Sequence, residues 1–91
     1  MSVLVRISSP LQNLAGNKAE LDVEATTVRQ VVDQLASQNE EFKTRLLDDS
    51  GNLLRFVNVF VNEEDVRFLQ KLETPLKDGD EVAIIPSVSG G

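Results

Sequence analysis

The sequence ends in two glycines, Gly90 and Gly91, and this pair offers the clearest chemistry on the chain. The terminal carboxylate of Gly91 is ionised at neutral pH and is a poor electrophile. Attack by this carboxylate on the α-phosphate of ATP would give an acyl-adenylate, and AMP would leave when a persulfide or thiol attacks the carbonyl. Glycine suits this reaction because a backbone without Cβ can enter a narrow channel and adopt φ > 0. We therefore predict that Gly91 is the reacting residue.

Residues 87–91 (Ser-Val-Ser-Gly-Gly) follow the last strand-like run and are expected to form a flexible tail. Five extended residues reach roughly 17 Å, so a folded body could stay outside a partner while the tail enters the partner's site. In that arrangement Val88, Ser89 and Gly90 thread into the partner together with Gly91. The simpler alternative is a frayed end or an expression scar, in which the glycines are incidental.

Composition excludes several other chemistries. The 91 residues include no cysteine and no histidine, which rules out disulfides, thiol nucleophiles, iron–sulfur clusters, the usual zinc sites and imidazole bases. Fifteen acidic and nine basic residues give a net charge of −6, which argues against nucleic-acid binding. The negative charge is compatible with a basic protein partner, although its simplest role is solubility.

The chain shows no membrane or export signal. No apolar run approaches the ~18 residues that span a bilayer, and residues 1–6 are too short and too soon charged for a signal peptide. We expect a single cytoplasmic domain that does not bind membranes. The acidic run Glu63-Glu64-Asp65 lacks the spacing of a calcium loop, so we expect a solvated turn and no metal site.

The first half of the chain predicts a hairpin followed by a helix. Residues 3–7 and 19–23 alternate between apolar and polar side chains, as strands with one buried face do. Pro10 closes the first strand, and residues 11–18 are expected to form a loop.

Thr27 and Gln30 form a T-x-x-Q capping box that begins a helix. The helix has an apolar stripe and ends near Asn39, and a second short turn follows over residues 40–47 with inward anchors. The stripe is Val28, Val31, Val32, Leu35 and Ala36, and the anchors are Phe42 and Leu46.

The second half predicts two further strands and a final one. Residues 56–62 form the clearest strand, with three valines on one face and Phe56 and Phe60 on the other. After the acidic turn, residues 66–68 are expected to return as a short strand, and residues 77–80 form a turn before a last strand over 82–86. The intervening loop has three expected buried anchors, which are Leu72, Pro75 and Leu76.

The order β-β-α-β-β-β indicates an α+β fold over residues 1–86. A single amphipathic helix must cover one face of a mixed sheet, which gives a β-grasp (ubiquitin-like) architecture of four to five strands. The first and last strands are expected to be parallel neighbours at the sheet centre. If the valines face the helix, then Phe56, Phe60 and Ile85 face outward as an apolar patch that a partner could bind. The alternative is that residues 40–55 cover this face.

The chain resembles the MoaD/ThiS ubiquitin-like sulfur-carrier family over most of its length. The resemblance lies in the order of elements, in the run Thr74-Pro75-Leu76-Lys77-Asp78-Gly79-Asp80-Glu81-Val82, and in the tail from Pro86 to Gly91. It is strongest from Arg55 onward. Within the family, residues 55–68 and the extra length between Phe42 and Leu54 look most like the CysO type.

This resemblance implies a carrier protein rather than an enzyme, with no bound cofactor. An E1-like adenylating enzyme of the MoeB/ThiF type would use ATP to adenylate Gly91, and a sulfur donor protein would then convert it to a thiocarboxylate. For CysO-type carriers the acceptor is a pyridoxal-phosphate-dependent cysteine synthase, and a metalloprotease later releases cysteine from the tail. For MoaD the acceptor is the large, catalytic subunit of molybdopterin synthase, and for ThiS it is thiazole synthase.

Two other functions stay open. A ubiquitin-like protein modifier would also be adenylated at Gly91 but would form isopeptide bonds with lysines of target proteins. A plain interaction module would not depend on Gly91. The tail does not separate cysteine biosynthesis from molybdopterin biosynthesis, so the pathway is not decided by the sequence.

Overall fold

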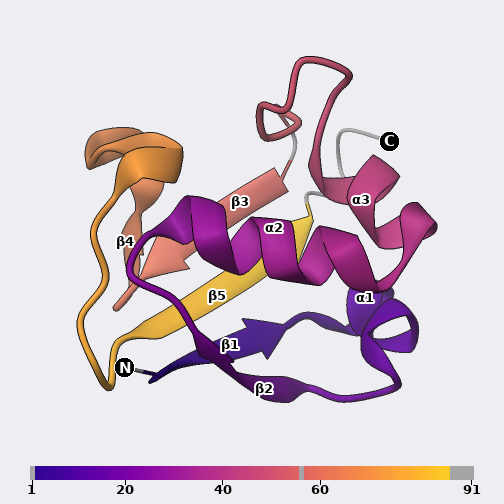
Figure 1. The fold of residues 1–91 in the computed structure, drawn as a ribbon, viewed down its shortest axis with the longest axis horizontal. Coiled ribbons are helices and arrows are strands. Elements are labelled where there is room, and N and C mark those ends of the chain that lie inside the picture. Colours follow the sequence, from indigo (N-terminus) through magenta and orange to yellow (C-terminus); the bar gives the residue numbers. More distant parts are fainter. Residues whose placement is uncertain (1, 56, 87–91) are drawn as a thin grey trace.

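The computed structural model describes residues 2–55 and 57–86, in which a five-stranded mixed sheet carries helices on one face (Figure 1). The strand order is β2-β1-β5-β3-β4. Strands β1 and β5 are parallel and every other neighbouring pair is antiparallel. The predicted β-grasp fold, with the first and last strands adjacent at the centre, is confirmed. The strands are β1 (Ser2–Ile7), β2 (Glu20–Glu24), β3 (Val57–Val61), β4 (Glu64–Asp65) and β5 (Glu81–Pro86).

The helices α2 (Val28–Gln38) and α3 (Glu40–Leu46) begin where side chains cap them. Thr27 Oγ1 accepts a hydrogen bond from the backbone N–H of Gln30 (3.3 Å), as the capping box predicts. Gln30 Oε1 in turn accepts from the backbone N–H of Thr26 (2.7 Å). Thr26 is one residue before the cap residue Thr27, whose N–H is the usual donor in a capping box. Asn39 ends α2 and caps α3, because its Oδ1 accepts from the N–H of Glu41 (2.8 Å).

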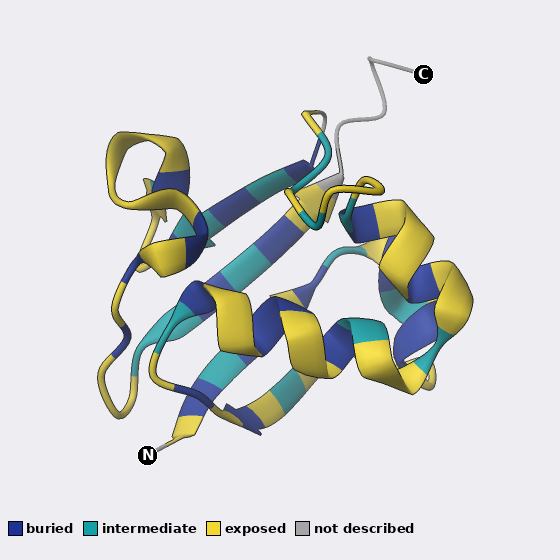
Figure 2. Cartoon of the chain, turned by 45° about the horizontal axis from the view of Figure 1, so that its top comes forward, coloured by how far each residue is buried: buried dark blue, intermediate teal, exposed yellow. Residues whose placement is uncertain are grey.

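The core lies between the helices and the sheet, where buried residues alternate along the strands (Figure 2). The alternation follows from strand geometry, in which successive side chains point to opposite faces. The valines of β3 face the helices, as predicted, and Phe42 and Leu46 anchor α3. The most buried core members are Val5, Val28, Val31, Leu35, Phe42, Leu46, Val82 and Ile84, all 0% exposed.

Within residues 2–55 and 57–86, every helix falls short of the length and apolar content needed to cross a membrane.

The segment between β1 and β2 is more regular than predicted. It contains a helix α1 (Ser9–Gln12) and a 3₁₀ turn η1 (Asn13–Ala15) in place of an irregular loop. Pro10 does not close the strand directly, since β1 ends at Ile7 and Pro10 lies in the first turn of α1, where its missing N–H costs no helical hydrogen bond. Leu11 and Leu14 are buried, so the segment packs onto the core through these two apolar side chains.

The predicted return strand at residues 66–68 is wrong. The turn falls at Asn62 and Glu63, which both have positive φ (50° and 73°), and the return strand is β4. Residues 66–68 form a 3₁₀ turn, η2 (Val66–Phe68), because Asp65 Oδ1 accepts from the N–H of Arg67 (2.9 Å) and ends the extended run. The acidic run therefore has one residue, Glu63, in the turn and two, Glu64 and Asp65, in β4.

One of the three predicted loop anchors is also wrong. Leu72, in the 3₁₀ turn η3 (Lys71–Glu73), and Leu76 are buried, but Pro75 is exposed. Thr74 takes the inward position and is 4% exposed. Its hydroxyl donates to the carbonyl of Lys71 (2.7 Å), which lets a polar side chain sit in the core without an unsatisfied group.

Candidate functional site

Strand β5 positions the C-terminal end of the fold. It is central in the sheet, between β1 and β3, and its inward side chains Val82 and Ile84 are fully buried. The last residue of the strand, Pro86, lies opposite Val57 of β3. The predicted reacting and threading residues follow at once along the chain. These are Val88, Ser89, Gly90 and Gly91, and all of them lie outside the described residues.

A hydrogen-bonded network fixes the start of β5. Asp80 accepts from the backbone N–H of Lys77 (2.8 Å) and from Asn62 Nδ2 (3.1 Å), while Asn62 Oδ1 accepts from the N–H of Glu81 (3.0 Å). The hydrogen bond from Lys77, followed by that from Asn62, holds the pKa of Asp80 below its ordinary value. Partial desolvation opposes this shift, and the charge of Lys77 adds to it.

The same turn ties β5 to the N-terminal strand. The N–H of Gly79 donates to the carbonyl of Ser2 (2.9 Å), and the N–H of Ser2 donates to Asp78 Oδ1 (2.9 Å). Gly79 has φ of 87°, a conformation that a residue with a Cβ rarely adopts. Together with the hydrogen bonds of Asn62, which directly follows β3, these contacts tie the turn to β1 and to the end of β3, so β5 is held on both sides where it begins.

The outer face of the sheet carries an apolar patch, the outer patch, made by Phe60, Ala83 and Ile85. Phe60 lies opposite Ala83, and Asn58 lies opposite Ile85, so the three side chains share one face. Ile85 is 42% exposed, and Phe60 and Ala83 are half-buried. The outward orientation predicted for Phe60 and Ile85 is confirmed. Phe56, the third predicted member of this surface, lies outside the described residues.

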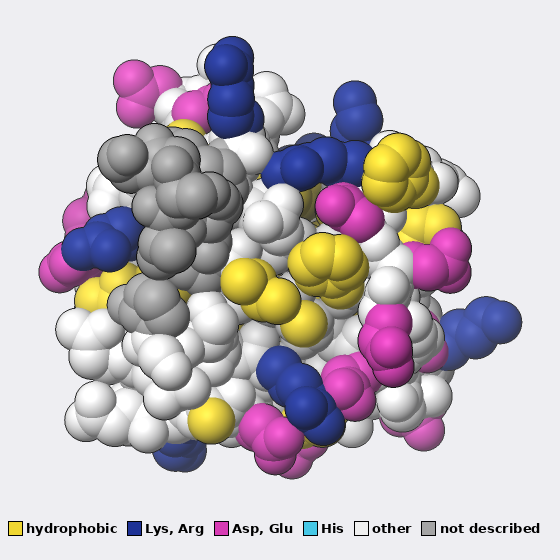
Figure 3. Space-filling model, turned by 180° about the vertical axis from the view of Figure 1, so that it is seen from behind, with side chains coloured by type: hydrophobic (Ala, Val, Ile, Leu, Met, Phe, Trp, Pro, Cys, Tyr) yellow, Lys and Arg dark blue, Asp and Glu magenta, His cyan; other side chains and the backbone are white. Residues whose placement is uncertain are grey.

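Charged side chains surround apolar ones on this face. Figure 3 shows hydrophobic side chains gathered near its middle, with acidic and basic groups around them. Arg6 Nε lies 2.8 Å from Glu81 Oε2 and 3.8 Å from Glu20 Oε2. An apolar centre with a charged rim is the usual anatomy of a protein interface. That this face binds a partner stays a prediction.

Residues 40–55 do not cover the outer face, contrary to the alternative that the sequence left open. Phe42 and Leu46 are buried in the core on the helix side, and Leu53 and Leu54 pack against that core. The N–H of Leu54 donates to the carbonyl of Leu46 (2.9 Å), which ties the end of this segment to α3. The outer patch is therefore left free by this segment.

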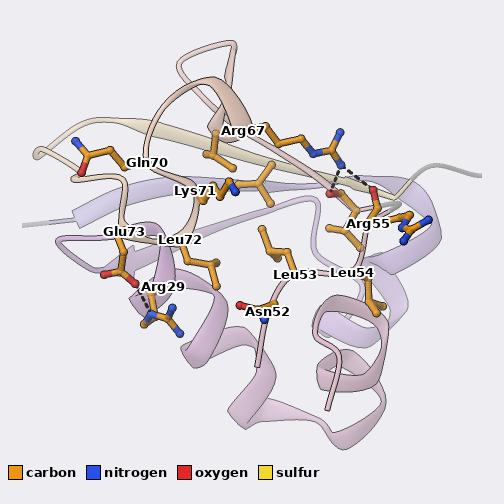
Figure 4. Close-up of a pocket in the computed structure, with 13 residues that line it drawn as sticks. Arg29, Asn52, Leu53, Leu54, Arg55, Arg67, Gln70, Lys71, Leu72 and Glu73 are labelled. Carbon is orange, nitrogen blue, oxygen red and sulfur yellow. Dashed lines mark hydrogen bonds and ion pairs between the residues drawn. The ribbon is translucent and has the colours of Figure 1, made fainter. Parts of the chain in front are cut away.

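Two features were missed by the sequence interpretation. Phe68 is 86% exposed and Leu69 is 37% exposed, in a stretch that was predicted to be a strand and a loop. A hollow on the helix side of β3, lined by residues 52–55 and 70–73, brings together segments that are distant in the chain (Figure 4). No periodicity points to either feature, because both depend on how η2 and η3 lie against the sheet.

The acidic run shows no arrangement suited to a metal ion. Glu64 and Asp65 belong to β4, and Asp65 uses one carboxylate oxygen to accept from the N–H of Arg67. Among residues 2–55 and 57–86, no group of three acidic side chains converges as a cation site would require.

Comparison with known proteins finds relatives that share this fold. The chain is 40% identical to the sulfur carrier protein CysO of Mycobacterium tuberculosis, and 32% identical to small archaeal modifier protein 3 of Haloferax volcanii. Both alignments cover 100% of this chain and 100% of the relative. A chain in the crystal structure of the Amycolatopsis orientalis BexX/CysO complex superimposes with a TM-score of 0.86 at 39% identity, covering 98% of this chain and 99% of that chain.

These relatives are sulfur carriers and a small modifier, and the solved structure shows such a carrier in complex with another protein. They agree with the resemblance seen in the sequence, including its CysO-like character. The sequence matches the ThiS family over residues 5–91, and the chain belongs to that family.

Proposed function

We propose that this chain is a sulfur carrier whose C-terminal Gly91 is adenylated by an E1-like enzyme of the MoeB/ThiF type. The carboxylate attacks the α-phosphate of ATP, pyrophosphate leaves, and an acyl-adenylate forms. A persulfide on a sulfur donor protein attacks the carbonyl and AMP leaves. A thiol reductant then supplies two electrons to cleave the sulfur–sulfur bond, which leaves a thiocarboxylate on Gly91. ATP is thus a substrate of the partner enzyme and not a cofactor of this chain.

The full-length identity of 40% to a CysO sulfur carrier is the observation that carries this proposal. The position of β5 supports it, because a buried central strand gives a five-residue tail a fixed point of departure. The tail can then enter a partner while the body docks outside through the outer patch. The function follows from a division of labour, in which this chain presents the carboxylate and its partners supply the catalytic groups.

The similarity to CysO favours a pyridoxal-phosphate-dependent cysteine synthase as the acceptor of the sulfide. The large subunit of molybdopterin synthase is the other acceptor that the family resemblance implies. Incubation of the thiocarboxylated chain with each enzyme and its co-substrate distinguishes them by intact mass, since only the true acceptor consumes the thiocarboxylate. The cysteine synthase should leave a cysteine joined to Gly91, which the metalloprotease then hydrolyses to the carboxylate, whereas molybdopterin synthase should return the carboxylate directly.

Intact-mass measurement tests the proposal. The full chain is incubated with the activating enzyme, ATP, a persulfide donor and a reductant, and we expect the mass gain of one oxygen-to-sulfur exchange. Deletion of Gly91 should abolish the gain and leave the unfolding transition unchanged. A full-length chain that shows no ATP-dependent gain in mass, or a deletion variant that is modified as readily, would refute the proposal.

A second function is favoured by the 32% identity to a small archaeal modifier protein. A modifier would also be adenylated at Gly91, but a lysine amine of a target protein would displace AMP and form an isopeptide bond. High-mass conjugates that depend on ATP and on Gly91 would support the modifier, whereas the thiocarboxylate mass alone supports the carrier.

A further inference from the structure

A half-open hollow lies on the helix side of the sheet, opposite to the outer patch. Its volume is about 760 Å³, and its walls come from residues 52–55, from residues 70–73 and from the first turn of α2 (Figure 4). The inward faces of β3 and η2 form its floor through Val57, Val59 and Val66. The hollow therefore has an apolar base inside a rim of polar and charged side chains.

The rim is basic on a chain that is acidic as a whole. Its charged members are four basic side chains and one acidic one, whereas the whole chain has a net charge of −6. Two of the four basic side chains already have partners within the fold. Arg29 forms an ion pair with Glu73 (2.8 Å), and Arg67 Nη2 donates to the carbonyl of Arg55 (2.8 Å). Within the described part of the chain, the side chains of Arg55 and Lys71 form no ion pair.

The backbone holds Lys71 at this rim in an uncommon conformation. Its φ of 54° lies in the left-handed region, which a residue with a long side chain seldom adopts. Buried Thr74 stabilises it, because both the hydroxyl and the N–H of Thr74 donate to the carbonyl of Lys71 (2.7 and 3.2 Å). The backbone position from which the Lys71 side chain extends is therefore set by the fold before any ligand arrives.

One side of the hollow, formed by residues 52–55 and Val57, lies at the end of the sheet where β5 ends. Val57, on its floor, is the residue of β3 that lies opposite Pro86, the last residue of β5. Arg55 precedes Val57 by two residues. Gly91 is five residues beyond the end of β5, and five extended residues reach roughly 17 Å. A protein that encloses Gly91 must therefore come close to this end of the domain and to the hollow.

We propose that the hollow binds an acidic segment of the enzyme that activates the tail, with carboxylates paired to Arg55 and Lys71 and an apolar side chain seated on the floor against Leu53 and Leu72. This inference rests on the proposed function, because that function supplies the partner. The segment is acidic because the rim charges that form no ion pair within residues 2–55 and 57–86 are positive, and the negative charge of the whole chain would otherwise disfavour such a partner. The outer patch and the hollow would then hold the partner on both sides of β5.

Paired charge reversals test the inference on the full chain. The double variant Arg55→Glu/Lys71→Glu is compared with Lys18→Glu/Lys43→Glu, which makes the same change in net charge at exposed sites outside the hollow. The measurement is ATP-dependent pyrophosphate release by the ThiF-type enzyme of the same organism. We expect the first variant to raise KM for the carrier about tenfold or more with little change in kcat, because two charge pairs are lost and repulsion replaces them. The control variant should keep the KM of the wild type.

Three outcomes overturn the inference. Equal KM values for both double variants would show that only overall charge matters. Nuclear Overhauser contacts between the Val88 methyl groups and those of Leu53 or Leu72 in the free full-length chain would show that its own tail fills the hollow. If the wild-type chain supports no pyrophosphate release, the proposed function fails and the inference falls with it, whereas normal release without selective loss refutes the inference alone.

Discussion

Ile84 and Ile85 are adjacent and chemically identical, yet β5 places them in opposite environments. Ile84 is fully buried between the sheet and the helices, and Ile85 is 42% exposed on the outer face. The difference arises because successive side chains of a strand point to opposite faces. One strand can therefore stabilise the domain with one set of residues and present a binding surface with the other, and changes to the second set need not unfold the first.

The largest difference in the free energy of unfolding is expected between variants of the two isoleucines. Ile84→Ala should lower the free energy of unfolding by about 2–5 kcal/mol, because it removes buried methyl groups and leaves a cavity. Ile85→Ala should cost less than about 1 kcal/mol, since the side chain keeps part of its contact with water in the folded state. Urea unfolding of the two variants measures both values, and similar losses would contradict the assignment of the two faces.

Phe60, on the neighbouring strand β3, tests the same separation between a binding face and a buried face. Phe60→Asp should weaken binding to the activating enzyme and cost less than about 2 kcal/mol of stability, because the side chain lies on the outer face and is only half-buried. Titration calorimetry and urea unfolding measure the two effects. Phe68→Asp is the matched control, since Phe68 is 86% exposed and outside the outer patch. A stability loss well beyond 2 kcal/mol would place Phe60 in the core.

Asp80 tests whether the start of β5 is held by the hydrogen-bonded network. Asp80→Asn should cost about 1 kcal/mol near neutral pH, because hydrogen bonds to a charged acceptor at a partly exposed site are replaced by weaker ones. Asp49→Asn, in the exposed turn before Gly51, is the control.

The stabilisation from Asp80 should also depend on pH. Its pKa in the folded state is lowered from the ordinary 3.8, so its contribution is complete well above pH 3.8 and is lost as the pH falls through the folded pKa. The stability gap between the wild type and Asp80→Asn should therefore narrow in acid. A gap that stays constant down to the lowest pH at which the chain is folded would show that the charge contributes nothing.

The smallest effect is expected at the rim of the outer face. Arg6→Ala removes the ion pairs to Glu81 and Glu20, but the side chain of Arg6 is 56% exposed. Pairs of this kind contribute roughly 0.2–1 kcal/mol, and added salt weakens them. Urea unfolding at low and high salt should show a small loss that shrinks with salt. A loss that does not change with salt would mean that Arg6 acts through packing.

Much of the fold was predictable because local patterns and tertiary packing agree. Alternation marked the inward valines of β3, and the capping box at Thr27 and Gln30 marked the start of α2, since each pattern carries its own physical cause. The prediction of a return strand at residues 66–68 was wrong although the residue types there favour strands. The side chain of Asp65 accepts from the N–H of Arg67 and starts a 3₁₀ turn instead. The prediction for Pro75 was wrong because burial alternates along residues 72–76, so Leu72, Thr74 and Leu76 are buried and Pro75 between them is exposed. Thr74 can occupy its buried position because its hydroxyl has hydrogen-bond partners there.

The candidate site divides in the same way. The terminal glycines and the outward orientation of Phe60 and Ile85 follow from the order and alternation of residues, so the sequence by itself determined which residues end the tail and which side chains of the sheet turn away from the core. That residues 40–55 leave this face uncovered was decided by the tertiary structure. The pairing of β5 with both β1 and β3, and the basic hollow between residues 52–55 and 70–73, exist only once distant segments meet. Tertiary structure decided these features because contacts across such separations depend on how helices and turns pack, which no local period encodes.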